Sequence, residues 1–208
     1  MKKDWKFIGG IIAFVLITIW SGYNAYDPTL WFLEAGICLV GVTILIITHH
    51  KFRFTDLSYA FILLHMVILL VGAHYSYARE PLFNWIQDYF DLERNNFDKV
   101  GHFAQGFIPA LITRELFIRL NIIQKRSWIP FLVICVALAI SAFYELIEWW
   151  AAGLFEQSAE DFLGTQGYVW DTQSDMFCAM IGAISMLLIL SRIQNRQIKK
   201  IAPSPFKF

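Results

Sequence analysis

The chain has 208 residues, of which 57% are hydrophobic and 16% are charged, and its formal net charge is zero. Soluble domains contain about 45–50% apolar and about 25% charged residues, so this composition excludes an ordinary soluble protein and indicates an integral membrane protein. The zero net charge argues against a nucleic-acid partner. The length allows one transmembrane domain over residues 1–208.

Six segments are apolar over about 20 residues, which is the length a helix needs to cross about 30 Å of hydrocarbon. They predict an all-α, polytopic membrane helix bundle with spans at about 7–23, 30–48, 57–73, 100–120, 128–150 and 174–193. The fourth span is the least apolar. Between the third and fourth spans, apolar residues in 81–91 favour a short amphipathic helix on the outer membrane interface.

Lysine and arginine indicate the orientation of the spans, because cytoplasmic loops are enriched in them. Of the 17 basic residues, 13 lie before the first span, in the loops after the second and fourth spans, or at and beyond the end of the sixth. We therefore expect both termini to be cytoplasmic and the loops near 74–99 and 151–173 to face outward. Residues 194–208 are predicted to form a basic cytoplasmic tail along the inner leaflet.

With this orientation, several ionisable residues fall at one depth near the outer leaflet. They are His74, Asp98, His102, Glu145, Glu148, Asp171 and Asp175, and Glu34, near the outer start of the second span, belongs to the same layer. Residues 98 and 102, 145 and 148, and 171 and 175 are three or four positions apart, so each pair shares one helix face. A carboxylate at the centre of a membrane helix costs roughly 2.5–3.5 kcal/mol. Such groups should therefore face each other, water or a ligand, and a cation, a proton or a basic partner should hold them together.

This layer contains our candidate functional residues. Glu145, Glu148 and His102 are candidate catalytic residues, as acid, base or proton carrier. Candidate ligands of a divalent cation (Zn, Mn or Mg) are Asp98, His102, Glu148, Asp171 and Asp175. As a structural alternative, Asp98 and Asp171 sit where N-caps complement a helix dipole, whereas Glu145 and Glu148 lie near a helix C-terminus and need another partner.

A second polar layer lies deeper in the fourth span. Arg114 and Glu115 follow His102 by 12–13 residues, which is roughly 18–20 Å along a helix. This places them near the inner leaflet, where we expect internal pairing.

Residues 95–115, 142–150 and 164–176 resemble the bacterial inner-membrane YjdF family. These runs read NNFDKVGHFAQGFIPALITRE, AFYELIEWW and GTQGYVWDTQSDM. The resemblance covers most of the chain and implies a multi-pass protein of the inner (plasma) membrane with no established activity. A more distant similarity to VanZ-like membrane proteins rests on residues 98–103, Glu145, and Asp175 before Gly182, and departs from that pattern at Ala179.

Three functions remain open. The first is a membrane-embedded enzyme or binding site for a lipid-linked or cell-envelope substrate. The second is a small transporter or proton-coupled permeation protein, motivated by the two polar layers on the fourth span. The third is a structural or partner-binding membrane protein. The bilayer is a partner in all three, and all three are compatible with an oligomer.

Overall fold

The computed structural model describes residues 4–155 and 166–201, and all the regular secondary structure there is helical. The helices are α1 (Trp5–Gly22), α2 (Pro28–Thr48), α3 (Asp56–Tyr75), α4 (Pro81–Phe90), α5 (Phe97–Arg119), α6 (Ile129–Phe155) and α8 (Asp171–Ile201). Two short 3-10 turns, η1 (Tyr77–Arg79) and η2 (Arg126–Trp128), precede α4 and α6. The predicted all-α class is therefore confirmed.

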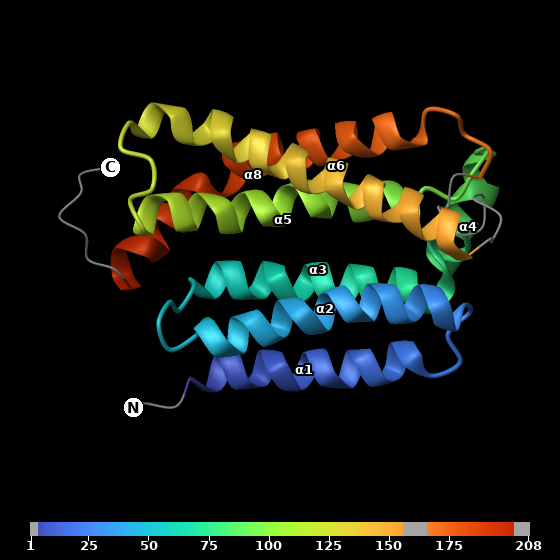
Figure 1. The fold of residues 1–208 in the computed structure, drawn as a ribbon, viewed down its shortest axis with the longest axis horizontal. Helices are drawn as coiled ribbons and strands as arrows, with labels where there is room; N and C mark the ends of the chain where they lie inside the picture. The colour runs from blue at the N-terminus through green and yellow to red at the C-terminus, as the bar shows by residue number, and fades with distance from the viewer. Residues whose placement is uncertain (1–3, 156–165, 202–208) are drawn as a thin grey trace.

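The long helices run alternately back and forth, so that the start of α1 and the end of α8 lie at the same end of the bundle (Figure 1). The short α4 lies at the opposite end. Helix α5 packs against α3 on one side and against α6 and α8 on the other. It joins the α1–α3 half of the molecule to the α6–α8 half.

Five of the predicted spans are confirmed as helices long and apolar enough to cross a membrane: α1, α2, α3, the segment 126–151 with α6, and α8. Helix α5 is not among them, although it is 23 residues long. Polar residues such as Gln105, Thr113 and Arg114 lower its hydropathy, and these are buried against other helices. The sixth span and the orientation of the termini therefore stay predictions.

Helices α5 and α8 approach until their backbones touch. A Cβ on Gly106 would lie 1.8 Å from the carbonyl oxygen of Ala179, and one on Gly182 would lie 2.1 Å from that of Phe103. Small residues allow this close approach and favour helix association in membranes. The contact fixes the first turns of α5 and α8 side by side, which positions the polar residues discussed below.

The predicted helix at 81–91 is present as α4. Pro81 begins it, the Glu80 carboxylate accepts a hydrogen bond from the Phe83 N–H at 2.8 Å, and Asp91 ends it in the left-handed conformation. Trp85 and Tyr89 are exposed. This amphipathic surface suits a membrane interface, although the location at the interface stays a prediction.

Helix α8 continues past the predicted end of the last span to Ile201. The Gln197 side chain accepts a hydrogen bond from the Leu57 N–H at 2.9 Å, and the Gln194 side chain donates one to the Leu111 carbonyl at 2.7 Å. These contacts hold residues 194–201 of the predicted basic tail as helix. The rest of that tail, 202–208, lies outside the described residues.

The polar side chains of the deeper layer, Arg114 and Glu115, form their hydrogen bonds within the bundle. The Glu115 carboxylate is fully buried and accepts hydrogen bonds from Thr55, Ser58 and Arg119, all between 2.6 and 2.9 Å. Arg114 donates to the side chains of Gln194 and Asn195 in α8, at 2.7 and 2.8 Å. Both residues therefore link α5 to neighbouring segments.

Candidate functional site

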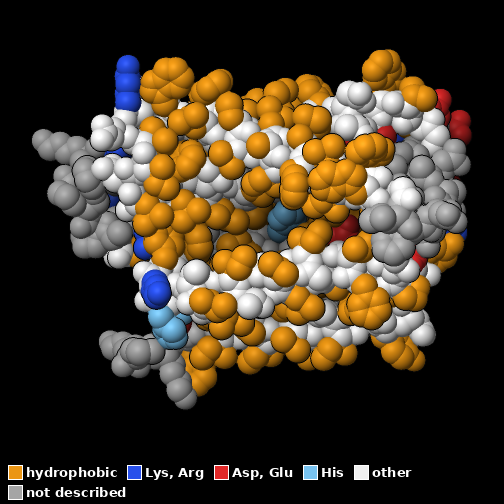
Figure 2. Space-filling model, viewed as in Figure 1, with side chains coloured by type: hydrophobic (Ala, Val, Ile, Leu, Met, Phe, Trp, Pro, Cys, Tyr) orange, Lys and Arg blue, Asp and Glu red, His pale blue; other side chains and the backbone are white. Residues whose placement is uncertain are grey.

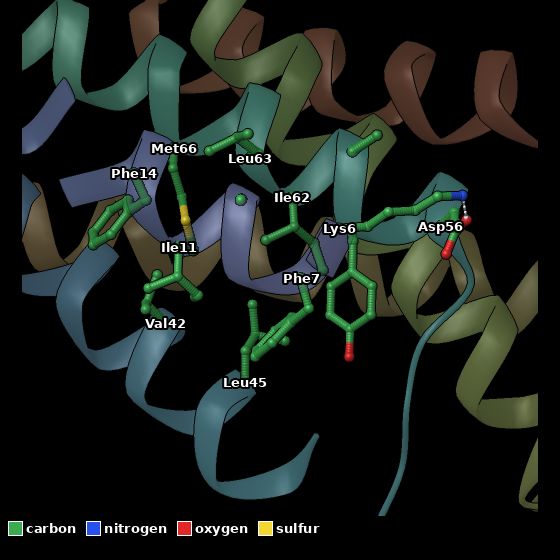
Figure 3. Close-up of a pocket in the computed structure, with 14 residues that line it drawn as sticks. Lys6, Phe7, Ile11, Phe14, Val42, Leu45, Asp56, Ile62, Leu63 and Met66 are labelled. Atoms are coloured by element: carbon green, nitrogen blue, oxygen red, sulfur yellow. Dashed lines mark hydrogen bonds and ion pairs between the residues drawn. The ribbon is translucent and has the colours of Figure 1, made fainter. Parts of the chain in front are cut away.

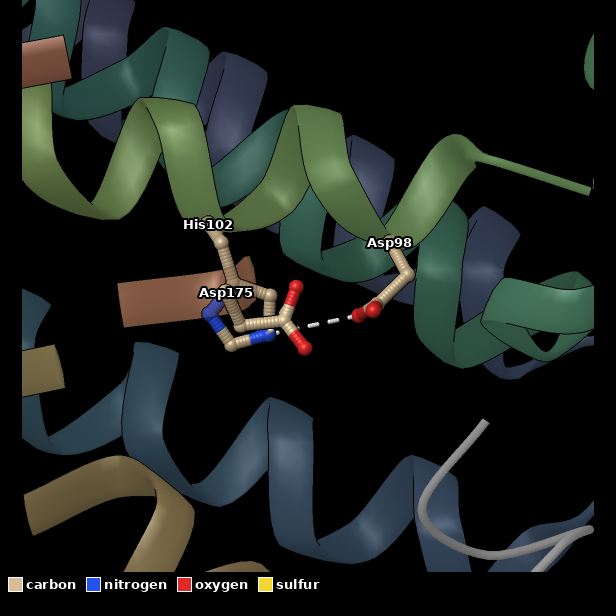
Figure 4. Close-up of side chains that lie close together, drawn as sticks. All are labelled: Asp98, His102 and Asp175. Carbon is tan, nitrogen blue, oxygen red and sulfur yellow. Dashed lines mark ion pairs between the residues drawn. The ribbon is translucent and has the colours of Figure 1, made fainter. Parts of the chain in front are cut away.

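Three helix ends meet near α4 and bring six of the predicted polar residues together. Helix α5 contributes residues 98 and 102, α6 contributes 145 and 148, and α8 contributes 171 and 175. With the basic residues described next, they form what we call the acidic cluster: Arg94, Asp98, Lys99, His102, Glu145, Glu148, Asp171 and Asp175. Figure 4 shows Asp98 and His102 converging on Asp175 across the α5–α8 contact.

Two basic residues hold part of this cluster together. The Lys99 ammonium lies 2.7 Å from an Asp171 oxygen and 2.6 Å from an Asp175 oxygen, and the Arg94 guanidinium lies 2.6 Å from Asp171. The three side chains Lys99, Asp171 and Asp175 are 18%, 8% and 3% exposed. A basic partner, which was one of the three expected ways to offset the repulsion, therefore binds Asp171 and Asp175.

The sequence interpretation missed Lys99 and Arg94 as members of this layer. In the prediction of membrane orientation, both residues were treated only as basic residues of an outward-facing loop. The available signal was position: Lys99 directly follows Asp98, and Arg94 precedes it by four residues.

His102 lies at the centre of the remaining carboxylates. Its Nε2 atom is 3.3 Å from Asp98 Oδ1 and 3.9 Å from Asp175 Oδ1, and its Nδ1 atom is 3.6 Å from Glu145 Oε1. Nδ1 also lies 3.2 Å from the Gln105 side-chain oxygen. A ring with oxygen atoms on both sides can donate two hydrogen bonds as an imidazolium, or bind a metal through one nitrogen as a neutral imidazole.

The cluster contains more carboxylates than cations. Its five carboxylates face Arg94, Lys99 and, when protonated, His102. Asp98 Oδ2 and Glu145 Oε1 are buried without a hydrogen-bond partner among the described residues. A buried carboxylate oxygen that accepts no hydrogen bond is costly. These two oxygens have only longer charge contacts, Asp98 Oδ2 with Lys99 at 3.6 Å and Arg94 at 3.8 Å, and Glu145 Oε1 with His102 at 3.6 Å. A bound cation or a proton would lower this cost.

A small cavity adjoins Asp98, His102 and Glu148. It has a volume of about 10 Å³, and its lining comprises Leu69, Tyr77, Asp98, Gly101, His102, Gln105, Tyr144 and Glu148. A space of this size holds about one water molecule. A single small ion therefore fits it with little rearrangement.

Four carboxylates form two groups with His102, two carboxylates in each. Ligand atoms of Asp98, His102 and Asp175 lie within 4.8 Å of one another, and so do those of His102, Glu145 and Glu148. The structure thus brings together four of the five predicted metal ligands. Asp171 belongs to neither group, because it binds Arg94 and Lys99. Asp98 and Asp171 also lie in the first turns of α5 and α8, where the structural alternative expects carboxylates to complement the helix dipole.

Of the two remaining predicted members of the layer, His74 lies apart from the cluster and Glu34 lies beside it. His74 Nδ1 lies 2.9 Å from the Ser21 carbonyl oxygen, and its ring stacks near Trp20. Glu34 of α2 is buried and accepts a hydrogen bond from the Tyr144 hydroxyl of α6. This bond joins the two halves of the molecule beside the cavity.

The face in Figure 2 is hollowed between these halves. A histidine and an acidic side chain are visible in the hollow, surrounded by hydrophobic side chains. Polar groups therefore reach a surface that is otherwise apolar.

Comparison with known proteins identifies the family. A family model described as "Predicted membrane protein (DUF2238)" matches residues 8–196. The inner membrane protein YjdF of Escherichia coli (strain K12) is 47% identical over 189 residues, which cover 91% of this chain and 90% of that protein. No solved structure gives a significant match. The VanZ-like similarity stays a distant resemblance. The chain therefore belongs to the DUF2238 family of membrane proteins, together with YjdF, and is an integral protein of the bacterial inner membrane.

Proposed function

We propose that this protein binds one divalent cation in the acidic cluster, near the outer leaflet, and there binds or acts on a lipid-linked or cell-envelope substrate. The carrying observation is the set of four carboxylates around His102. Two of their buried oxygens, Asp98 Oδ2 and Glu145 Oε1, accept no hydrogen bond among the described residues, and their nearest basic groups lie 3.6–3.8 Å away. Mixed carboxylate and imidazole ligands suit Zn, Mn or Mg.

The outward location rests on six membrane crossings with both termini in the cytoplasm. Helix α5 supplies the sixth crossing in this proposal, since it runs antiparallel to α3 and α6 over 23 residues. Blue basic side chains gather at the end where α1 begins and α8 ends, and red acidic ones at the opposite end (Figure 2). By the positive-inside rule, the acidic cluster then faces outward.

The chemistry would be shared between the cation and the protein. A bound cation supplies a Lewis acid that polarises a carbonyl or phosphoryl oxygen. Glu145 and Glu148 have no cationic partner as close as that of Asp171, so they are the groups free to accept or donate protons. Asp171 and Lys99 would keep the ligand-bearing turns of α5 and α8 in place.

The surroundings support a lipid-linked substrate. Trp149, Trp150 and Trp170 are exposed at the same end of the bundle as the cluster. Aromatic side chains of this kind suit the interface between lipid tails and head groups.

Transport is less well supported. A path from the cluster to the deeper polar layer would follow α5, where Ile108 and Leu111 are buried. The backbone contacts of Gly106 and Gly182 close the α5–α8 interface over the same stretch. A purely structural cluster is the other alternative, but its ion pairs reach Asp98 Oδ2 and Glu145 Oε1 only at 3.6 Å or more, beyond hydrogen-bond distance.

Elemental analysis of the purified full-length protein tests the cation. After incubation with Zn, Mn and Mg, about one bound ion per chain is expected in the wild type. The double variant Asp98→Asn, Glu148→Gln should lose it, whereas Asp88→Asn, at an exposed position of α4 outside the cluster, should keep it. Thermal unfolding confirms that each variant is folded.

Two results would overturn the cation proposal: no ion in the wild type, or equal ion content in the double variant. The substrate is tested separately by mass spectrometry of lipids extracted from the same preparations. A lipid-linked envelope intermediate enriched with the wild type over the double variant is expected. Equal lipid content in both would remove that part of the proposal and leave the cation site unaffected.

A further inference from the structure

A second cavity lies in the other half of the molecule and shares no residue with the acidic cluster. It is a groove of about 350 Å³ between α1, α2 and α3 (Figure 3). Its apolar lining includes Ile11, Phe14, Val42, Leu45, Ile62 and Met66. This volume is within the range of about 300–1,000 Å³ that small-molecule sites occupy.

Two adjacent glycines leave the space open on the α1 side. A Cβ added at Gly9 or Gly10 would meet nothing within 4 Å. Glycine within a helix is unfavourable relative to alanine, and here no close helix contact explains it, unlike at Gly106. We infer that these two glycines keep the groove free of side chains from α1.

One end of the groove is charged. Lys6 and Asp56 line it and form an ion pair there (Figure 3). Asp56 is also held by Arg53 at 2.5 Å, and Arg53 binds Asp4 at the same distance. The Lys6 side chain is 78% exposed. Lys6 can therefore turn to another anion while Arg53 retains Asp56.

The surroundings define what can occupy the groove. All three helices that form it are long and apolar enough to span a membrane, so the groove opens to lipid chains. Its charged end belongs to the basic end of the bundle, where the Arg119 guanidinium also contacts the Arg53 carbonyl at 2.6 Å. Basic segments next to a membrane attract anionic lipids.

We propose that this groove binds one acyl chain of an anionic phospholipid, with the phosphate of its head group against Lys6. The other occupant to consider is a second copy of the protein, which the test below distinguishes by the oligomeric state.

Native mass spectrometry of the delipidated full-length protein tests this site. With phosphatidylglycerol, about one tightly bound lipid per chain is expected, with at least a fivefold preference over phosphatidylcholine. The double variant Gly9→Leu, Gly10→Leu fills the groove and should lower phosphatidylglycerol binding at least fivefold. Ala60→Leu fills it independently from α3 and should act in the same direction.

Matched controls separate the groove from general effects of added bulk or lost charge. Gly36→Leu adds a side chain at another open glycine outside the groove, so binding should be unchanged. Lys6→Gln should abolish the preference for phosphatidylglycerol, whereas Lys51→Gln, whose residue does not line the groove, should preserve it.

The proposal is overturned if the groove-filling variants bind phosphatidylglycerol like the wild type, or if the wild type binds both lipids equally. It is also overturned if light scattering finds a dimer of the wild type and a monomer of the Gly9→Leu, Gly10→Leu variant, because a second copy of the protein then occupies the groove.

Discussion

The half-buried Lys99 is the position where one substitution should disturb the candidate site most. Lys99→Gln removes the charge that binds Asp171 and Asp175, whose side chains are 8% and 3% exposed. Asp171 keeps Arg94, but Asp175 loses its closest cation. Leaving one buried charge without compensation costs about 3–5 kcal/mol. We expect a loss of this size in the free energy of unfolding, measured in mixed micelles with increasing dodecyl sulfate.

The chain offers a matched control for this prediction. Lys6 also binds an aspartate, but the two side chains are 78% and 39% exposed. Exposed pairs contribute about 0–1 kcal/mol, so Lys6→Gln should cost no more than that. In a double-mutant cycle, Lys99→Gln combined with Asp175→Asn should be more stable than the sum of the two single losses predicts, because the uncompensated carboxylate is removed. If Lys99→Gln costs no more than Lys6→Gln, the view that Lys99 neutralises the cluster is wrong.

Three other variants test other parts of the structure. Gly106→Ala forces α5 away from α8 and should cost about 1–3 kcal/mol or more in the same assay; Gly36→Ala has room for its methyl group and should be neutral or stabilising. Glu115→Gln places an amide among hydrogen-bond donors and should cost about 1–3 kcal/mol, and an unchanged midpoint would contradict the buried network. The hydrogen bond from Arg53 lowers the pKa of Asp4 below its ordinary value of 3.8. The ionised Asp4 therefore stabilises the folded state at pH values above 3.8, and this contribution is lost as the pH falls through the lower pKa of the folded state. The wild type should therefore lose more thermal stability between about pH 5 and pH 3 than Asp4→Asn does, and equal losses would refute the pairing.

Much of the architecture follows from physical rules that act on single segments. A helix that crosses a bilayer needs about 20 apolar residues, and this requirement predicts α1, α2, α3, α6 and α8. Three- and four-residue spacings put the carboxylate pairs on shared faces. Alternating helix direction then brings Asp98 and Asp175 to one level, without knowledge of any contact.

What the sequence did not reveal depends on which side chains reach each other. Lys99 and Arg94 counted as loop residues, although their side chains reach two aspartates on α8. His74 has the right depth but lies on another side of α3, beside Ser21. Glu34 and Tyr144 are 110 positions apart, and no local pattern relates them. The low hydropathy of α5 also has a three-dimensional cause, since protein covers most of it.

The charge of the cluster limits how many ions it can hold. Five carboxylates against Arg94 and Lys99 give a net charge of −3 when His102 is neutral, as a metal ligand must be. One divalent cation reduces this to −1, and one proton on Glu145 or Glu148 brings it to zero. A second divalent cation would leave a buried positive charge, which is as costly as a buried negative one. Lys99 therefore favours a site with one cation and one mobile proton over a two-metal centre.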